Sequence, residues 1–129
     1  MCVDKIKKQI VCHENLCVII LIMNKLIKKA LQFEKSGEYD KALKMYMELE
    51  NQSLSQEDRL FISRSIAACF YYRHDYKEAR KRFDSILKDK SLKADVVKEI
   101  NNCIALCFLY GGETDKARNF FLSEIRDTE

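Results

Sequence analysis

Apolar residues recur along this chain with helical spacing, in runs that end at short polar breaks. Leu26, Ala30 and Phe33 lie three or four positions apart, and Phe70 and Phe108 each follow two apolar residues by three and four positions. Such spacing places side chains on one face of an α-helix. The runs end at KSGEY, YRHDY and YGGET, and a second amphipathic run follows each break. The pattern predicts an all-α fold made of helix pairs joined by tight turns.

A ten-residue motif occurs three times with variations, as GEYDKALKMY (37–46), HDYKEARKRF (74–83) and GETDKARNFF (112–121). Its alanines, Ala42, Ala79 and Ala117, are separated by 37 and 38 residues. Other positions agree at fixed distances from this alanine. They are Ala30, Phe33, Tyr39 and Tyr46 in the first copy, Ala67, Phe70, Tyr76 and Phe83 in the second, and Ala105, Phe108, Thr114 and Phe121 in the third. This agreement indicates an internal repeat.

The repeated residue types have a physical role. A small residue such as Ala30 or Ala42 lets two helix backbones approach closely, and the aromatic residues fill the wedge between them. Acidic residues follow each break, where a helix N-terminus favours negative charge; they are Asp40, Asp75 and Asp115. Ser55 and Asp58 have the spacing of a capping box. One helix pair cannot bury its apolar face alone, so successive pairs are expected to stack.

The repeat resembles the tetratricopeptide repeat (TPR), whose pattern has a small residue, an aromatic, a Gly-x-Tyr turn, an alanine and a further aromatic. The resemblance covers residues 24 to about 127 and departs from the family in several ways. The periods exceed 34 residues, with the extra residues in ENQSLSQED and KDKSLKADV, and no proline follows the second helices. His74 replaces a turn glycine, and Thr114 replaces a tyrosine. Leu26, Ser63 and Asn101 replace the early tryptophan.

The resemblance implies an α-solenoid of three stacked antiparallel helix pairs, with an extra N-terminal helical segment. We expect a TPR-like domain over residues 24–129, with repeats at about 24–54, 55–91 and 92–129, and an N-terminal extension over 1–23. Met23 opens the first repeat helix, so we hypothesise that residues 1–22 lie upstream of the natural start. The mass of the native protein would decide this, and a mass that includes residues 1–22 would rule the idea out.

The extension contains the strongest apolar run, LCVIILIM (16–23). Its length is well below the ~20 residues of a spanning helix, and NKLIKK follows it in place of a signal-peptidase site. A membrane-associated adaptor held by this segment is therefore the alternative and not the main expectation. The run could also fill a groove of its own molecule or of a neighbour. Cys12, His13 and Cys17 lack a second ligand pair, so we expect no metal there.

Composition agrees with a soluble helical protein: 47% of residues are hydrophobic, 33% are charged, and there is no proline. Cys69, Cys103 and Cys107 lie within apolar helical runs, which favours core packing in a reducing, cytoplasmic location. The chain carries no catalytic, cofactor-binding or phosphate-loop pattern, so we expect no enzyme activity and no cofactor. Residues 77–93 have seven basic and three acidic residues. A solvated helix face explains this better than a nucleic-acid or polyanion site.

The family resemblance implies a concave groove, lined by the first helices of the pairs, that binds a peptide or a partner helix. Transferred to this chain, the groove residues are Ile27, Leu31, Glu34 and Lys35, then Phe61, Arg64, Ala68, Tyr71 and Tyr72, then Glu99, Asn102, Leu106, Leu109 and Tyr110. This surface is apolar and aromatic, and it lacks the lysine and asparagine array of chaperone-binding members. We therefore expect a hydrophobic or amphipathic protein partner.

The last helix pair has no polar capping helix after it in the sequence. We expect Phe120, Leu122 and Ile125 to be partly uncovered, which favours a homo-oligomer or a docking surface there.

Overall fold

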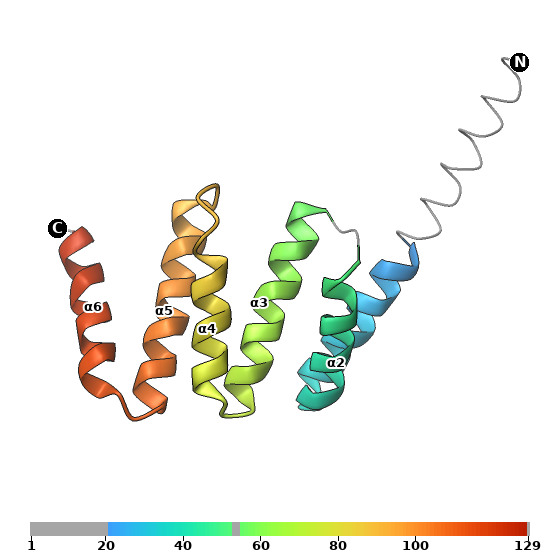
Figure 1. The fold of residues 1–129 in the computed structure, drawn as a ribbon, viewed down its shortest axis with the longest axis horizontal. Coiled ribbons are helices and arrows are strands. Elements are labelled where there is room, and N and C mark those ends of the chain that lie inside the picture. Colours follow the sequence, from blue (N-terminus) through green and yellow to red (C-terminus); the bar gives the residue numbers. More distant parts are fainter. Residues whose placement is uncertain (1–20, 53–54, 129) are drawn as a thin grey trace, which may run out of the picture.

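The computed structural model describes residues 21–52 and 55–128, and these residues form helices without strands. A first helix over residues 21–35 is followed by α2 (Tyr39–Glu50), α3 (Gln56–Tyr72), α4 (Tyr76–Ile86), α5 (Ala94–Tyr110) and α6 (Thr114–Thr128). Figure 1 shows these helices running up and down in chain order, each packed against the next. The described chain is thus an α-solenoid of three antiparallel helix pairs, which confirms the expected fold class.

The turn inside each pair has the same backbone structure. Gly37, His74 and Gly112 adopt positive φ angles of 82°, 67° and 86°. The next residue donates its backbone N–H to the carbonyl of the repeated phenylalanine five positions earlier, at 2.8 Å from Glu38 to Phe33 and at 2.9 and 2.7 Å in the later pairs. This is the Schellman arrangement that closes a helix C-terminus. His74 therefore takes a conformation that L-residues with a side chain adopt at a cost.

The core lies where the repeated small and aromatic residues meet. Ala30, Ala42 and Ala79 are fully buried, as close helix packing requires, and the Tyr46 ring is also fully buried. Phe121 differs from its counterparts Tyr46 and Phe83, because its side chain is 38% exposed. Tyr46 and Phe83 are buried in pairs that α3 and α5 follow, whereas no described helix follows α6.

Around this last pair, the burial of the apolar side chains is uneven. Phe120 is partly buried, with its ring 5.5 Å from that of Phe108. Leu122 is exposed. Exposed apolar surface is thus present on α6, where the sequence predicted it, although Phe120 contributes only part of its side chain.

Local signals in the sequence account for the helix starts and the cysteine positions. The Ser55 Oγ accepts the backbone N–H of Asp58 at 3.2 Å and caps α3. Asp75 caps α4 through the N–H of Glu78 at 3.4 Å. Cys69 and Cys107 are buried free thiols, in agreement with their predicted packing role.

Several predictions concern the N-terminal segment. The extension up to residue 20, including Cys12, His13 and Cys17, lies outside the described residues. Residues 21–23, the end of the apolar run, form the start of the first helix. No helix in the described ranges is both long enough and apolar enough to cross a membrane. Within the same ranges, no three metal-ligating side chains come together.

Candidate functional site

The first helices of the three pairs lie on one side of the solenoid. On this side the Arg64 guanidinium of α3 forms an ion pair with Glu99 of α5 at 2.8 Å. On the other side Arg82 of α4 approaches Glu50 of α2 at 3.5 Å. The two sides therefore consist of different helices, and the predicted groove residues belong to the first side.

A groove of about 540 Å³ opens on this side, and we call it the Phe61 groove. Its lining residues come from all three helix pairs. They are Glu34 of the first helix, Glu57, Leu60, Phe61, Arg64, Ser65 and Ala68 of α3, Phe83 of α4 and Cys103 of α5. Helix α3 contributes most because residues three and four positions apart share one helix face. A volume of this size falls in the range of pockets that hold small ligands or several side chains.

Phe61 gives the groove an exposed aromatic surface. Its side chain is 39% exposed, although its ring meets the buried Tyr46 ring edge-on at a centroid distance of 6.3 Å. An aromatic ring that is supported on one side and exposed on the other is a suitable anchor for an apolar partner.

The charge balance of the groove is negative. Glu34 Oε2 accepts a hydrogen bond of 2.9 Å from the Tyr46 hydroxyl. Burial raises the pKa of Glu34, and the Tyr46 bond opposes that shift in part. Burial and the Glu34 carboxylate also raise the pKa of the Tyr46 phenol. Within the described ranges no ion pair involves Glu34 or Glu57, whereas Arg64 is already paired with Glu99.

A cluster of five tyrosines lies beside the turns within the pairs, at the ends of α3 and α5 and the starts of α2 and α4. Tyr39 stacks on Tyr72 at 5.1 Å, and Tyr71 contacts Tyr72, Tyr76 and Tyr110 at ring distances of 5.4, 5.7 and 6.1 Å. Tyr72 and Tyr110 remain 49% and 59% exposed, while Tyr71 packs against the core. The tyrosine cluster thus links the three pairs and presents two rings to solvent.

The predicted groove residues fall into three groups. Phe61 and Arg64 line the Phe61 groove, together with Glu34 and Ala68, and Tyr71, Tyr72 and Tyr110 belong to the tyrosine cluster. The others line neither the groove nor the cluster, although Glu99 pairs with Arg64. Ile27 packs against the core, Leu31, Asn102 and Leu106 are half-buried, and Leu109 is exposed. Whether any of them binds a partner stays a prediction.

Sequence reasoning missed five groove residues, which are Glu57, Leu60, Ser65, Phe83 and Cys103. Glu57 precedes Phe61 by one helical turn, and Cys103 follows Glu99 by one turn. Extending the face by one turn before Phe61 would have found Glu57, and including the position one turn after Glu99 would have found Cys103.

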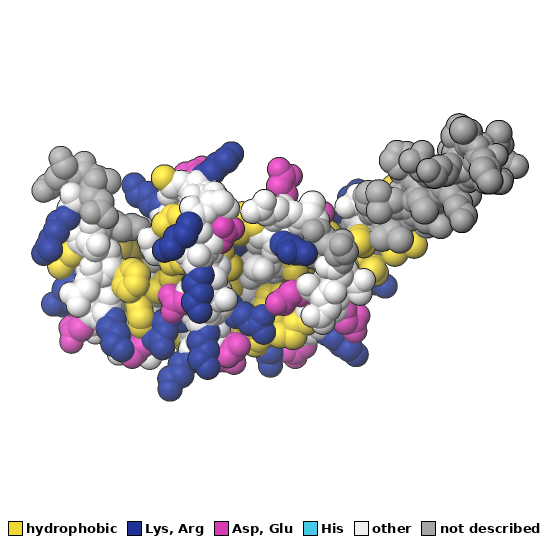
Figure 2. Space-filling view, turned by 45° about the horizontal axis from the view of Figure 1, so that its top comes forward, with side chains coloured by type: hydrophobic (Ala, Val, Ile, Leu, Met, Phe, Trp, Pro, Cys, Tyr) yellow, Lys and Arg dark blue, Asp and Glu magenta, His cyan; other side chains and the backbone are white. Residues whose placement is uncertain are grey.

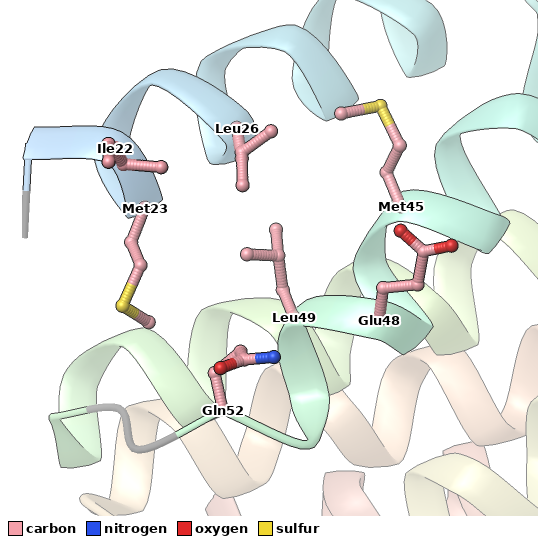
Figure 3. A pocket seen from close by; sticks show the side chains of 7 residues that line it. All are labelled: Ile22, Met23, Leu26, Met45, Glu48, Leu49 and Gln52. Carbon is pink, nitrogen blue, oxygen red and sulfur yellow. The ribbon is translucent and has the colours of Figure 1, made fainter. Parts of the chain in front are cut away.

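A second pocket, of about 310 Å³, opens between the first helix and α2 (Figure 3). Leu26 and Leu49 face each other across it, Ile22, Met23 and Met45 complete its apolar lining, and Glu48 and Gln52 are its polar members. Leu26 stands where the TPR pattern has a tryptophan, and the smaller side chain leaves space. Its counterpart Ser63 lines a pocket of about 130 Å³ with Glu50 of α2 and another of about 690 Å³ that extends to Val96 of α5.

Two basic residues of the stretch 77–93 form ion pairs with other described helices and turns. Arg80 pairs with Glu113 at 3.0 Å and lies 4.7 Å from the Phe108 ring centroid, and Arg82 pairs with Glu50 and Glu78 at 3.5 Å. Figure 2 shows basic side chains spread across this face of the molecule, interspersed with acidic ones. Mixed charges of this kind suit a solvated helix face.

The arrangement of helices can be compared with known structures. The crystal structure of the TPR domain of Arabidopsis FLU superimposes with a TM-score of 0.67, covers 82% of this chain and 93% of the FLU domain, and shares 21% sequence identity. The chain has the TPR fold. No family model matches the sequence, and a search of the curated proteins found no match. In this TPR fold the Phe61 groove lies on the side formed by the first helices of the repeats.

Proposed function

We propose that this chain is a protein-interaction module that binds a peptide or a partner helix on the side formed by its first helices. The observation that carries the proposal is the Phe61 groove, which receives residues from all three pairs and exposes a supported aromatic ring. The TPR fold supports the proposal, because stacked helix pairs create extended surfaces of this kind. The tyrosine cluster would extend the same surface with Tyr72 and Tyr110.

We propose that the module has no enzymatic activity. Cys103 is the groove residue most suited to act as a nucleophile, but burial raises the pKa of its thiol. The thiolate, which is the reactive form, is therefore disfavoured. The remaining titratable groups of the groove are Glu34, Glu57 and Arg64, and the last already pairs with Glu99. The free thiols at Cys69, Cys103 and Cys107 support a reducing, cytoplasmic location.

Affinity capture with variants of the groove tests the proposal. The purified chain is compared with Phe61→Ala, Tyr72→Ala and Leu106→Ala, each checked for folding by circular dichroism. Leu122→Ala is the comparison variant, because it removes an exposed apolar side chain on α6, the other surface that we expect to dock a partner. We expect proteins captured by the wild type and by Leu122→Ala to be lost with Phe61→Ala. Phe61→Ala tests the groove, Tyr72→Ala tests the tyrosine cluster, and Leu106→Ala tests a half-buried position of α5 outside both. Partners retained by all three variants would show that another surface binds them.

A further inference from the structure

We infer that the partner of the Phe61 groove is a basic amphipathic segment, whose apolar side chains pack on Leu60 and Phe61 and whose lysine or arginine pairs with Glu34 and Glu57. This inference rests on the proposed function and specifies the chemistry of the partner.

The first argument comes from the surroundings of Glu34. Its side chain is half-buried in the groove wall, and the hydrogen bond from Tyr46 reaches only Oε2. An ionised carboxylate can accept about four hydrogen bonds, so most of its capacity is open to a ligand. A partly desolvated carboxylate without a cation is unfavourable, and a lysine or arginine from the partner would offset this cost.

The second argument comes from Arg64, the one basic residue among those lining the groove. Its guanidinium is held by Glu99 at 2.8 Å, so its charge is compensated within the fold. Glu34 and Glu57 form no ion pair with any described residue, and they leave the groove with negative charge. The chain as a whole has a formal net charge of +3. Because this net charge is positive, long-range electrostatic attraction would favour an anionic partner. A measured preference for a basic partner would therefore reflect the local negative charge of the groove and not the net charge of the chain.

The third argument is the position of the apolar groups. Leu60, Phe61 and Ala68 line the same groove as both carboxylates. A partner with apolar and basic residues on one helix face would meet both kinds of group at once. The exposed Phe61 ring can also attract the cation through its π face.

Calorimetric titration with designed peptides tests the inference. The probe is an amphipathic peptide of leucine, alanine and lysine with both ends capped, and two matched peptides replace every lysine by glutamine or by glutamate. We expect the lysine peptide to bind about tenfold tighter than the glutamine peptide, since charge-assisted hydrogen bonds are stronger than neutral ones. Added salt should reduce this advantage.

Variants of the protein locate the effect. Glu34→Gln keeps the side-chain shape and an acceptor for Tyr46, and it should weaken the lysine peptide several-fold while leaving the glutamine peptide unchanged. Glu57→Gln should act in the same direction but less, because Glu57 is more exposed. Asp84→Asn is the matched control: it makes the same charge change at an exposed position of α4 that does not line the groove, and it should have no effect.

The outcomes separate this inference from the proposed function. Equal binding of all three peptides, each weakened by Phe61→Ala, would keep the groove as the binding site and overturn the basic partner. Tighter binding of the glutamate peptide, lost when Lys77 and Lys81 are replaced by glutamine, would overturn the inference in favour of the basic stretch. Failure of every peptide to bind would count against both the inference and the proposed function.

Discussion

The hydroxyl of Tyr46 donates a 2.9 Å hydrogen bond to Glu34 Oε2, and so joins the repeated core to the wall of the Phe61 groove. Tyr46 is one of the aromatic residues that recur in every repeat, and it is fully buried. Glu34 belongs to the less repetitive residues of the first helix. The architecture thus positions the group that we expect to select the partner.

Glu34 should make folding stability depend on pH. Burial raises its pKa above the ordinary value of 4.5, so the folded state holds the proton more tightly than the unfolded chain. The resulting stability is fully present below pH 4.5 and is lost as the pH rises through the folded-state pKa. At neutral pH the ionised carboxylate therefore costs stability, and Glu34→Gln should unfold at a higher temperature than the wild type.

Thermal unfolding at neutral and acidic pH measures this difference. The advantage of Glu34→Gln should shrink below pH 4.5, and Asp84→Asn should show no comparable pattern. A Glu34→Gln protein that is less stable than the wild type at neutral pH would contradict the burial argument.

Substitutions at the two turn positions Gly37 and His74 should change the free energy of unfolding in opposite directions. Gly37 has a φ of 82°, and a Cβ added there meets nothing within 4 Å, so Gly37→Ala tests backbone strain alone. We expect it to lower the free energy of unfolding by about 1–2 kcal/mol. His74→Gly removes the same strain at a φ of 67° but also the 2.7 Å contact of His74 Nδ1 with the Tyr76 hydroxyl. It should be neutral or stabilising in urea denaturation, and a loss as large as that of Gly37→Ala would be contrary to expectation.

Much of the fold could be predicted because it depends on local spacing. The recurrence of Ala42 and Ala79 predicted close helix packing, and both side chains are fully buried. The alignment of His74 with Gly37 predicted a turn residue, and both residues have a positive φ. The exposure of Phe121 does not follow from this local spacing, because Phe121 aligns with the buried Tyr46 and Phe83. The lack of a helix after the last pair predicted exposed apolar side chains on α6, but not at Phe121.

The candidate site was only partly predictable, for a different reason. The family resemblance placed Phe61, Arg64 and Glu99 on the side of the first helices. It did not predict that Arg64 pairs with Glu99, which is 35 residues away in sequence. Side-chain pairing across helices depends on rotamers and helix spacing. Leu26 stands where the TPR pattern has a tryptophan, and this smaller residue was the sequence feature that marked the position of the pocket. The residue pattern alone did not indicate a cavity of 310 Å³.

Close packing at Ala79 gives a prediction about stability. Its side chain is fully buried, so Ala79→Leu would force added atoms between packed helices. We expect a loss of about 1–3 kcal/mol in the free energy of unfolding. Ala94→Leu is the matched control, because Ala94 is exposed at the start of α5. Equal stability of the two variants in urea would refute the packing role of the repeated alanine.

The three described thiols should differ in reactivity. Burial raises the pKa of Cys69 to about 12 and that of Cys107 to about 11, while Cys103 is half-buried in the groove. Alkylation of the native protein at neutral pH should therefore label Cys103 first and leave Cys69 and Cys107 unlabelled until unfolding. Mass spectrometry of the digested protein measures each site. The lysine peptide should slow labelling of Cys103, and labelling of Cys69 at the same rate as Cys103 would be inconsistent with this structure.

The pairing of Arg64 with Glu99 can be tested separately from folding. Both side chains are substantially exposed, so Glu99→Gln should change the free energy of unfolding by less than about 1 kcal/mol. It should nevertheless weaken binding of the lysine peptide, because Arg64 would then add an uncompensated positive charge to the groove. Calorimetric titration measures the change in affinity, and a denaturation curve measures the change in the free energy of unfolding. Unchanged affinity would indicate that Arg64 does not influence the charge of the groove.

The central claim is that a partner segment occupies the Phe61 groove, and amide NMR of the isotope-labelled protein during titration with the lysine peptide tests it most directly. We predict that the largest shift changes fall on the face of α3 from Glu57 to Ala68 and around Cys103 of α5. Changes confined to the basic stretch 77–93, or to the pocket at Leu26 and Leu49, would contradict the claim.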